Sequence, residues 1–182
     1  MIYVHLAEGF EEIEALTVVD VLRRADLQVN TISMEKTLEV KGAHEILVKA
    51  DIMFSQADYK ICEMIVLPGG MPGTSNLMNN EDLGKKVLEF NQGGKYLAAI
   101  CAGPMIFGEL GILADKKATI YPGMESHLKQ GDYKDIPVVV DGNIITSQGP
   151  ATAMNFALEL VGILKGSDGK KEVAKGLLFK EV

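Results

Sequence analysis

Cys101 stands where two patterns meet in the sequence. The apolar run 96–100 before it is typical of a buried strand, and the run that begins at Pro104 is typical of a helix. A sharp turn between a strand and a helix lifts a nucleophile above the sheet edge, and the N–H groups that open the helix favour a thiolate. A free cysteine is also a common core residue. The position of Cys101 therefore predicts either a nucleophile or a structural thiol.

Glu14 is a second residue whose type and place suggest chemistry. With about 100° between successive residues, Glu14 falls on the apolar face of the helix predicted for residues 11–25. A carboxyl group there is costly unless it is neutral or partnered, so we expect Glu14 to lie beside a polar group at the strand ends. The alternative is that its side chain reaches solvent at the rim of that face. Glu11 and Glu12 lie in the first helical turn, where the dipole favours carboxylates, and are expected to be solvated.

The glycine-rich segment 66–73, VLPGGMPG, ends another apolar strand. Its glycines permit positive φ and close approach of the backbone. It matches neither the dinucleotide fingerprint G-x-G-x-x-G nor a Walker loop. We expect the N–H group of Gly70 to join that of Ala102 in an oxyanion hole near Cys101. The alternative is a plain turn.

The three histidines show no metal-ligand spacing with one another or with a cysteine, so no metal site is expected. His5 lies inside the first predicted strand and is expected in the core. His127 is the one histidine downstream of Cys101 and is a candidate proton carrier. Cys62 precedes a buried strand and is expected to be an inert thiol.

The composition favours one globular domain. The 182 residues include 47% apolar and 24% charged residues, and the formal net charge is −7. We expect a single domain over residues 1–182. The negative charge argues against partners such as nucleic acid or anionic membranes, and no apolar stretch reaches the roughly 20 residues that span a bilayer. Two cysteines without a disulfide framework, and an N-terminus unlike a signal peptide, indicate a cytoplasmic protein.

Strand-like and helical patterns alternate along the whole chain. Strands are predicted at 2–7, 28–34, 44–54, 63–68 and 95–100, and helices at 11–25, 81–92, 103–113, 149–166 and 169–179. Near-continuous apolar strands that alternate with helices indicate an α/β fold, with a mostly parallel sheet covered on both faces. The dipeptide at Asp141 and Gly142 predicts a small antiparallel hairpin within 137–147. Ligands bind at the carboxyl ends of such parallel strands.

Five segments carry a resemblance to a known family. They are LAEGFEEIE, VDVLRRA, VLPGGMPGTSNL, AAICAGP and TSQGPATAMNFAL, in this order. The chain resembles the ThiJ/PfpI superfamily, and specifically its parkinsonism-associated deglycase branch, over nearly its whole length. The resemblance implies a flavodoxin-like sandwich that is usually a homodimer. It also implies a reactive, oxidation-prone Cys101 paired with a protonated Glu14, with amide donors at Gly70 and Ala102.

The chain departs from its apparent relatives in how it could supply a base. Peptidase-like members carry a histidine directly after the nucleophile, where this chain has Ala102. Some members of the deglycase branch carry a histidine before the proline of a later motif, where this chain has Tyr121. Glutaminase relatives use a later His-x-Glu pair, and none follows Cys101. A Cys–His–Glu arrangement is therefore not assured, and either Tyr121 or His127 is left as a candidate proton carrier.

The predicted function is cysteine-dependent handling of reactive carbonyls. A Cys101 thiolate of lowered pKa would add to a small aldehyde or a glycated group, and Glu14 would transfer the proton, with no metal or organic cofactor. The reaction would be glyoxalase III-like or deglycase-like and would give a hydroxy acid. The alternative is a redox sensor or chaperone that signals through oxidation of Cys101. Both need the same thiolate, and an inert binding module would leave Glu14 unexplained.

Overall fold

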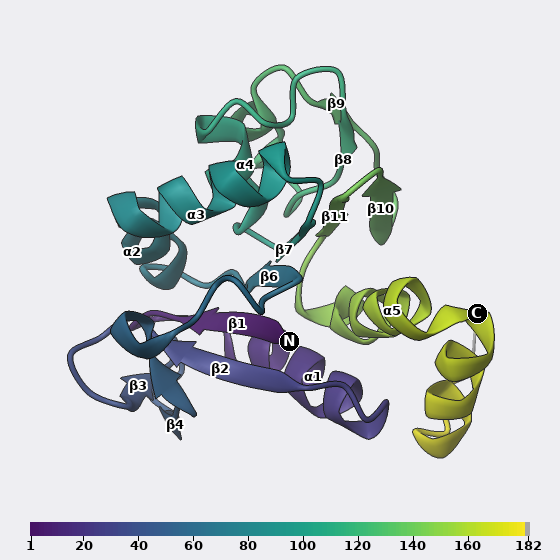
Figure 1. The fold of residues 1–182 in the computed structure, drawn as a ribbon. Coiled ribbons are helices and arrows are strands. Elements are labelled where there is room, and N and C mark those ends of the chain that lie inside the picture. Colours follow the sequence, from purple (N-terminus) through teal and green to yellow (C-terminus); the bar gives the residue numbers. More distant parts are fainter. Residues whose placement is uncertain (181–182) are drawn as a thin grey trace.

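The computed structural model describes residues 1–180, which fold around a seven-stranded sheet (Figure 1). The strand order is β10-β11-β7-β6-β1-β2-β5, and every pair is parallel except β10 with β11. The strands are β1 (Ile2–Leu6), β2 (Val29–Ser33), β5 (Ile52–Met53), β6 (Met64–Leu67), β7 (Tyr96–Ile100), β10 (Val138–Asp141) and β11 (Ile144–Ser147). The predicted mostly parallel sheet and its antiparallel hairpin are confirmed.

Helices cover both faces of this sheet (Figure 1). One face carries α1 (Glu12–Arg24) and α5 (Ala153–Gly176), and the other carries α2 (Gly73–Met78), α3 (Glu81–Gln92) and α4 (Pro104–Glu109). Two small two-stranded sheets complete the fold: β3 (Glu39–Lys41) with β4 (Leu47–Lys49), and β8 (Lys117–Ala118) with β9 (Asp132–Tyr133). Among the described residues, no helix has the length and apolar character needed to cross a membrane.

Strand β1 shows why both faces are covered. Ile2, Val4 and Leu6 pack in the core under α1 and α5, whereas Tyr3 and Ala7 pack in the core under α3 and α4. Successive side chains of a strand point to opposite faces, so a strand with no polar face must lie between two apolar layers. The central strands are therefore rigidly held, and their ends are a firm platform for a site.

Several element boundaries differ from the predictions. Helix α4 ends at Glu109, four residues earlier than predicted, because Gly111 at φ 70° leaves the helical conformation. Gly166, at φ 78° and ψ 175°, breaks α5 into two helical parts, close to the predicted break. The segment predicted as one strand at 44–54 divides into β4 and β5, and the short helix α2 was missed.

The order of the strands brings three distant segments together. Strand β6 lies between β1 and β7, and all three run parallel, so their carboxyl ends meet at one edge. The segments that leave these ends are 7–11, 68–72 and 101–103. These are the three junctions from which the sequence predicts the site.

Candidate active site

Cys101 occupies a sharp turn between β7 and α4. Its φ is 62°, in the left-handed region, which costs a non-glycine residue roughly 1–2 kcal/mol. The Cys101 N–H donates to the Ser147 carbonyl at 2.9 Å, and the Tyr121 N–H donates to the Cys101 carbonyl at 3.0 Å. A Cβ on Gly103 would lie 2.6 Å from the Leu67 carbonyl oxygen, so the turn requires glycine there. The surrounding structure thus holds Cys101 in a strained conformation with its side chain partly exposed.

Glu14 lies on α1 with its side chain completely buried. Its Oε2 accepts a 2.8 Å hydrogen bond from the Gly69 N–H, and its carboxyl group lies beside the Cys101 thiol, whose pKa it raises. Within residues 1–180, the buried Oε1 has no hydrogen-bond partner. The carboxyl group therefore faces the thiol from a site that water does not reach.

Gly69 and Gly70 allow the segment after β6 to pass close to both groups. A Cβ on Gly69 would lie 2.6 Å from the Cys101 Cβ and 2.8 Å from the Glu14 Oε2. Gly70 has φ 88°, and a Cβ there would lie 2.4 Å from the Glu11 nitrogen. The backbone N–H groups of Gly70 and Ala102 favour the thiolate of Cys101 and lower its pKa, against the larger effect of burial. The structure thus brings all four residues singled out from the sequence into one site.

The electrostatics of the pair place one condition on reactivity. Burial raises the pKa of Glu14 to about 7, although hydrogen bonds with Cys101 and Gly69 oppose the rise. Burial and then the charge of Glu14 raise the pKa of the Cys101 thiol to about 12. The predicted lowered thiol pKa is therefore not met while Glu14 is ionised. A thiolate near neutral pH requires the proton to reside on Glu14.

The predicted solvation of Glu11 and Glu12 is wrong, since both are buried, at 7% and 4% exposure. Glu11 is the N-cap of α1 and accepts the Glu14 N–H at 2.7 Å. Glu12 accepts the His44 N–H at 2.8 Å and pairs with the His44 Nδ1 at 2.7 Å. Burial opposes ionisation of Glu12, but these bonds outweigh it and lower its pKa. No local pattern predicts this burial, because His44 lies 32 residues from Glu12 along the chain.

The same three residues are the candidate cation ligands. Glu11, Glu12 and His44 place ligand atoms within 4.8 Å of one another. The ion pair between Glu12 and His44 uses two of these atoms, and the N-cap uses the second oxygen of Glu11. These three side chains are therefore already bound to one another or to the start of α1.

The other histidines lie apart from this chemistry or at its margin. His5 is fully buried, as predicted, and its Nε2 lies 2.6 Å from the Tyr59 hydroxyl. His127 is half-buried in a short 3₁₀ helix, Glu125–Leu128, that packs against α4. Tyr121 contacts the nucleophile through its backbone, while its side chain is 47% exposed.

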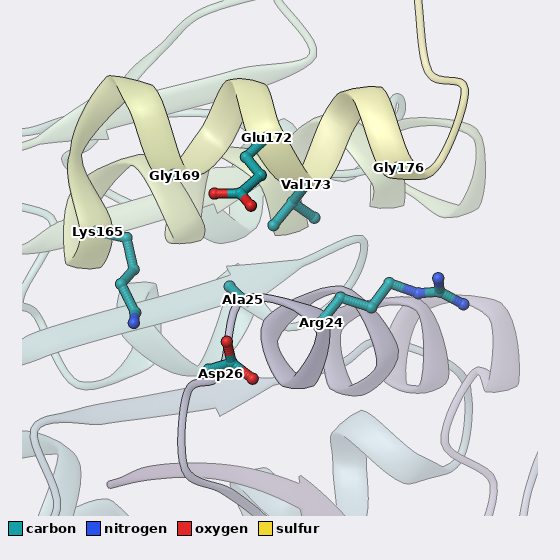
Figure 2. A pocket seen from close by; sticks show the side chains of 8 residues that line it. All are labelled: Arg24, Ala25, Asp26, Lys165, Gly169, Glu172, Val173 and Gly176. Atoms are coloured by element: carbon teal, nitrogen blue, oxygen red, sulfur yellow. The ribbon is translucent and has the colours of Figure 1, made fainter.

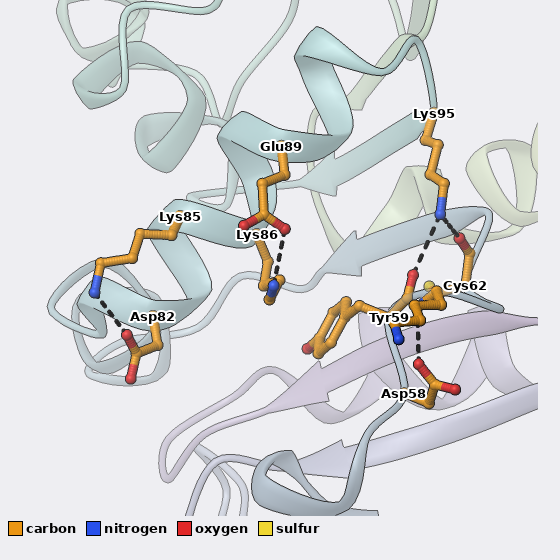
Figure 3. Close-up of polar contacts among 9 residues, drawn as sticks. Asp58, Tyr59, Cys62, Asp82, Lys85, Lys86, Glu89 and Lys95 are labelled. Atoms are coloured by element: carbon orange, nitrogen blue, oxygen red, sulfur yellow. Dashed lines mark hydrogen bonds and ion pairs between the residues drawn. The ribbon is translucent and has the colours of Figure 1, made fainter.

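Cys62 lies at the opposite end of β6 from the site and is 1% exposed. Its thiol donates to the Met64 carbonyl at 3.2 Å, and burial raises its pKa to about 11. Figure 3 shows the Lys95 ammonium bound to the carbonyl oxygens of Cys62 and Tyr59, at 2.6 and 3.2 Å. Lys95 thus holds the backbone of this segment, and the thiol faces the core.

A separate cavity of about 430 Å³ lies between the end of α1 and the second half of α5 (Figure 2). Its lining carries charges of both signs, and Arg24 is already paired with Asp20 at 2.7 Å. No residue of the thiol site lines it. The chemistry therefore belongs to the carboxyl ends of the strands.

A family model described as DJ-1/PfpI family matches residues 1–163. The chain belongs to this family. The Arabidopsis thaliana "Protein DJ-1 homolog B" is 36% identical over 178 residues, which are 97% of this chain and 41% of that protein. The chain thus spans less than half the length of this DJ-1/PfpI relative. The Caenorhabditis elegans "Glutathione-independent glyoxalase DJR-1.2" is 34% identical over 172 residues, 93% of this chain and 91% of that protein.

The solved structures agree with this membership in the DJ-1/PfpI family. Toxoplasma gondii DJ-1, described as oxidized, superimposes with a TM-score of 0.95 and 34% identity, covering 99% of this chain and 98% of that one. The flavodoxin-like fold implied by the five sequence segments is therefore confirmed.

Proposed function

We propose that this protein is a cysteine-dependent enzyme that converts small oxoaldehydes to hydroxy acids. The observation that carries the proposal is the pairing of the partly exposed Cys101 with a fully buried Glu14 carboxyl group. A relative of similar length carries the name of a glutathione-independent glyoxalase, which supports the same reaction class. Glycated groups on larger molecules are a further substrate class for the same chemistry.

The proposed reaction begins when the Cys101 thiolate adds to the aldehyde carbon. The carbonyl oxygen gains the electron pair, and the N–H groups of Gly70 and Ala102 stabilise it. Protonation of that oxygen by Glu14 gives a hemithioacetal. The C–H proton of the former aldehyde carbon then moves to the neighbouring carbonyl carbon, and the hydroxyl proton moves to the neighbouring carbonyl oxygen. This isomerisation passes through an enediol and gives a 2-hydroxy thioester, with no net change in electrons. Water hydrolyses the thioester, releases the hydroxy acid and restores the thiol.

Glu14 suits these reaction steps because burial raises its pKa to about 7, so that its carboxyl group can hold a proton near neutral pH. A neutral carboxyl group donates to sulfur, whereas a carboxylate would repel it. Neither the thiolate nor the carboxyl group needs a metal or an organic cofactor for these steps. The proton carrier for the carbon-to-carbon transfer remains Tyr121 or His127.

Steady-state turnover of methylglyoxal tests the proposal. Cys101→Ser should abolish formation of lactate, because an alcohol cannot replace the thiolate in this pair. Cys62→Ser is the matched control and should retain the wild-type rate, because its thiol lies in the core. Equal turnover by wild type and Cys101→Ser would refute the enzymatic function.

A redox sensor or chaperone is the second candidate. The amide donors and the Glu14 proton that favour a thiolate would also favour a sulfinate, and the similar Toxoplasma structure is of an oxidized protein. Mild peroxide should convert Cys101 to the sulfinate and leave Cys62 unmodified, as read by peptide mass spectrometry. Oxidation of Cys101 in a protein without any turnover would favour this candidate over the enzyme.

We further propose a homodimer of single-domain chains in the cytoplasm. Exposed apolar side chains on α1 and the β3–β4 hairpin support an interface: Ile13 at 56%, Leu16 at 37%, Ile46 at 53% and Leu47 at 59% exposure. The contact between Glu12 and His44 makes these two segments neighbours. Ile46→Glu should convert the dimer to a monomer in analytical ultracentrifugation, and an unchanged mass would place the interface elsewhere.

A further inference from the structure

Three residues close a ring of hydrogen bonds beside the nucleophile. The Glu11 N–H donates to the Gly69 carbonyl at 2.9 Å, and the Gly69 N–H donates to the Glu14 Oε2 at 2.8 Å. The Glu14 N–H then donates to the Glu11 Oε2 at 2.7 Å. The ring joins the start of α1 to the segment that presents the Gly70 N–H to Cys101. Glu11 therefore links the two residues that flank the thiol, Glu14 and Gly69.

The carboxylate of Glu11 also lies close to Glu14, because it accepts the Glu14 N–H. Glu11 is 7% exposed, so water screens it little. Its charge raises the pKa of Glu14. Glu11 is not among the main groups that change the pKa of the Cys101 thiol. Glu11 therefore acts on the acid of the pair more than on the thiol.

Among the described residues, one cation is paired with the Glu11 carboxyl group. It is His44, but its Nδ1 lies 2.7 Å from the Glu12 Oε2 and 3.9 Å from the Glu11 Oε1. The histidine thus compensates mainly Glu12. The charge of Glu11 is stabilised instead by the Glu14 N–H and by the dipole at the start of α1.

We propose that Glu11 is a positioning residue, a role that rests on the proposed function. Its carboxylate holds Glu14 against Gly69 through the ring of hydrogen bonds, and its negative charge favours a neutral Glu14 that holds the proton that Cys101 loses. A residue that served only as a helix cap would be equally well replaced by serine, which is among the preferred N-cap residues. Variants that keep the cap but remove the charge of Glu11 therefore distinguish a positioning residue from a simple helix cap.

The test measures alkylation of Cys101 by iodoacetamide near pH 7, followed by mass spectrometry of its peptide. Glu11→Gln keeps the size and an acceptor oxygen but removes the charge. It should slow alkylation roughly threefold to tenfold, the change that about half to one pKa unit produces. Glu11→Asp keeps the charge and the cap and should stay near the wild-type rate. Glu12→Gln is the matched control and should also stay near it, because Glu12 binds His44 and not Glu14.

Thermal melting of each variant keeps the result decisive. If Glu11→Gln does not fold, Glu11→Ser supplies a strong cap without the charge and should show the same slow alkylation. A wild-type rate in a folded Glu11→Gln or Glu11→Ser variant would overturn the proposal. An equal loss in Glu11→Asp and Glu11→Gln would also overturn it, in favour of a purely geometric role.

Alkylation needs no turnover, so it separates this proposal from the proposed enzyme. Methylglyoxal turnover is measured on the same samples. Alkylation that depends on Glu11 in a protein without turnover would refute the enzymatic function and support the role of Glu11. If Glu11→Gln retains turnover and its alkylation rate is unchanged, the role of Glu11 is refuted and the enzymatic function is supported.

Discussion

The Tyr121 N–H donates a 3.0 Å hydrogen bond to the carbonyl oxygen of Cys101, so residue 121 is tied directly to the nucleophile. The Tyr121 ring lies over Gly149, where a Cβ would be 3.3 Å from it. The side chain is half exposed. A phenol with a reference pKa of about 10 is a poor base near neutral pH, whereas an imidazole is well suited.

Tyr121→His should therefore raise kcat for methylglyoxal, by up to roughly a hundredfold, the lower end of what a positioned general base contributes. The measurement is steady-state lactate formation near pH 7. Tyr121→Phe is the control for loss of the hydroxyl and should remain slow. Equal rates in the histidine and phenylalanine variants would show that residue 121 is not placed to move a proton.

Glu14 should make stability fall as the pH rises. Its pKa is about 7 in the folded protein and 4.5 as an ordinary carboxyl group, so the folded state binds the extra proton between these values. Its stabilising contribution is complete below pH 4.5 and is lost as the pH passes 7. The measurement is the free energy of unfolding in urea. Its value for wild type minus its value for Glu14→Gln should decline as the pH rises over this window, by on the order of 3 kcal/mol. A difference that is flat with pH would mean that Glu14 is ionised throughout.

His5 should have the opposite effect. Burial lowers its pKa from 6.5 to about 4, so the unfolded chain takes up a proton that the folded protein excludes. The stability that neutral His5 contributes is present above pH 6.5 and is lost as the pH falls toward 4. The free energy of unfolding of wild type minus that of His5→Gln should therefore rise with pH between these values. A declining difference would show that His5 is charged in the core.

Gly69→Ala should damage the site without requiring any change in its chemical groups. The added Cβ would lie 2.6 Å from the Cys101 Cβ and 2.8 Å from the Glu14 Oε2. Overpacking of this kind costs roughly 1–3 kcal/mol, and the displaced pair should lose most of its turnover. Gly84→Ala is the control, because a Cβ there meets only the Leu110 Cδ2 at 3.7 Å within α3. Full activity in Gly69→Ala would mean that the pair tolerates a wider spacing.

Local patterns were sufficient to predict Cys101 and Glu14. A strand-to-helix junction and an apolar helix face are properties of neighbouring residues, and alternation of strands and helices predicts which strand ends meet. The burial of Glu11 and Glu12 could not be predicted in this way. It depends on the β3–β4 hairpin, whose His44 reaches back across 32 residues to Glu12.

The boundaries that were missed have equally physical causes. The residues of α2, GTSNLM, show no helical periodicity and begin with glycine, so the helix depends on packing rather than on propensity. The division of 44–54 into β4 and β5 depends on partners: β4 pairs with β3, and β5 pairs with the distant β2. The residues of a strand do not by themselves determine which other strand it pairs with.

The order of the strands also sets when the thiol can become reactive during synthesis. Strand β7 needs β11 as its second neighbour, and the Cys101 N–H needs the Ser147 carbonyl, which is translated 46 residues later. Until that segment leaves the ribosome, Cys101 lacks the turn that directs its sulfur toward Glu14. The nascent chain therefore carries an ordinary cysteine through most of translation. The turn at Cys101 therefore depends on a segment made late in the chain, although the four site residues all lie within its first 102 positions.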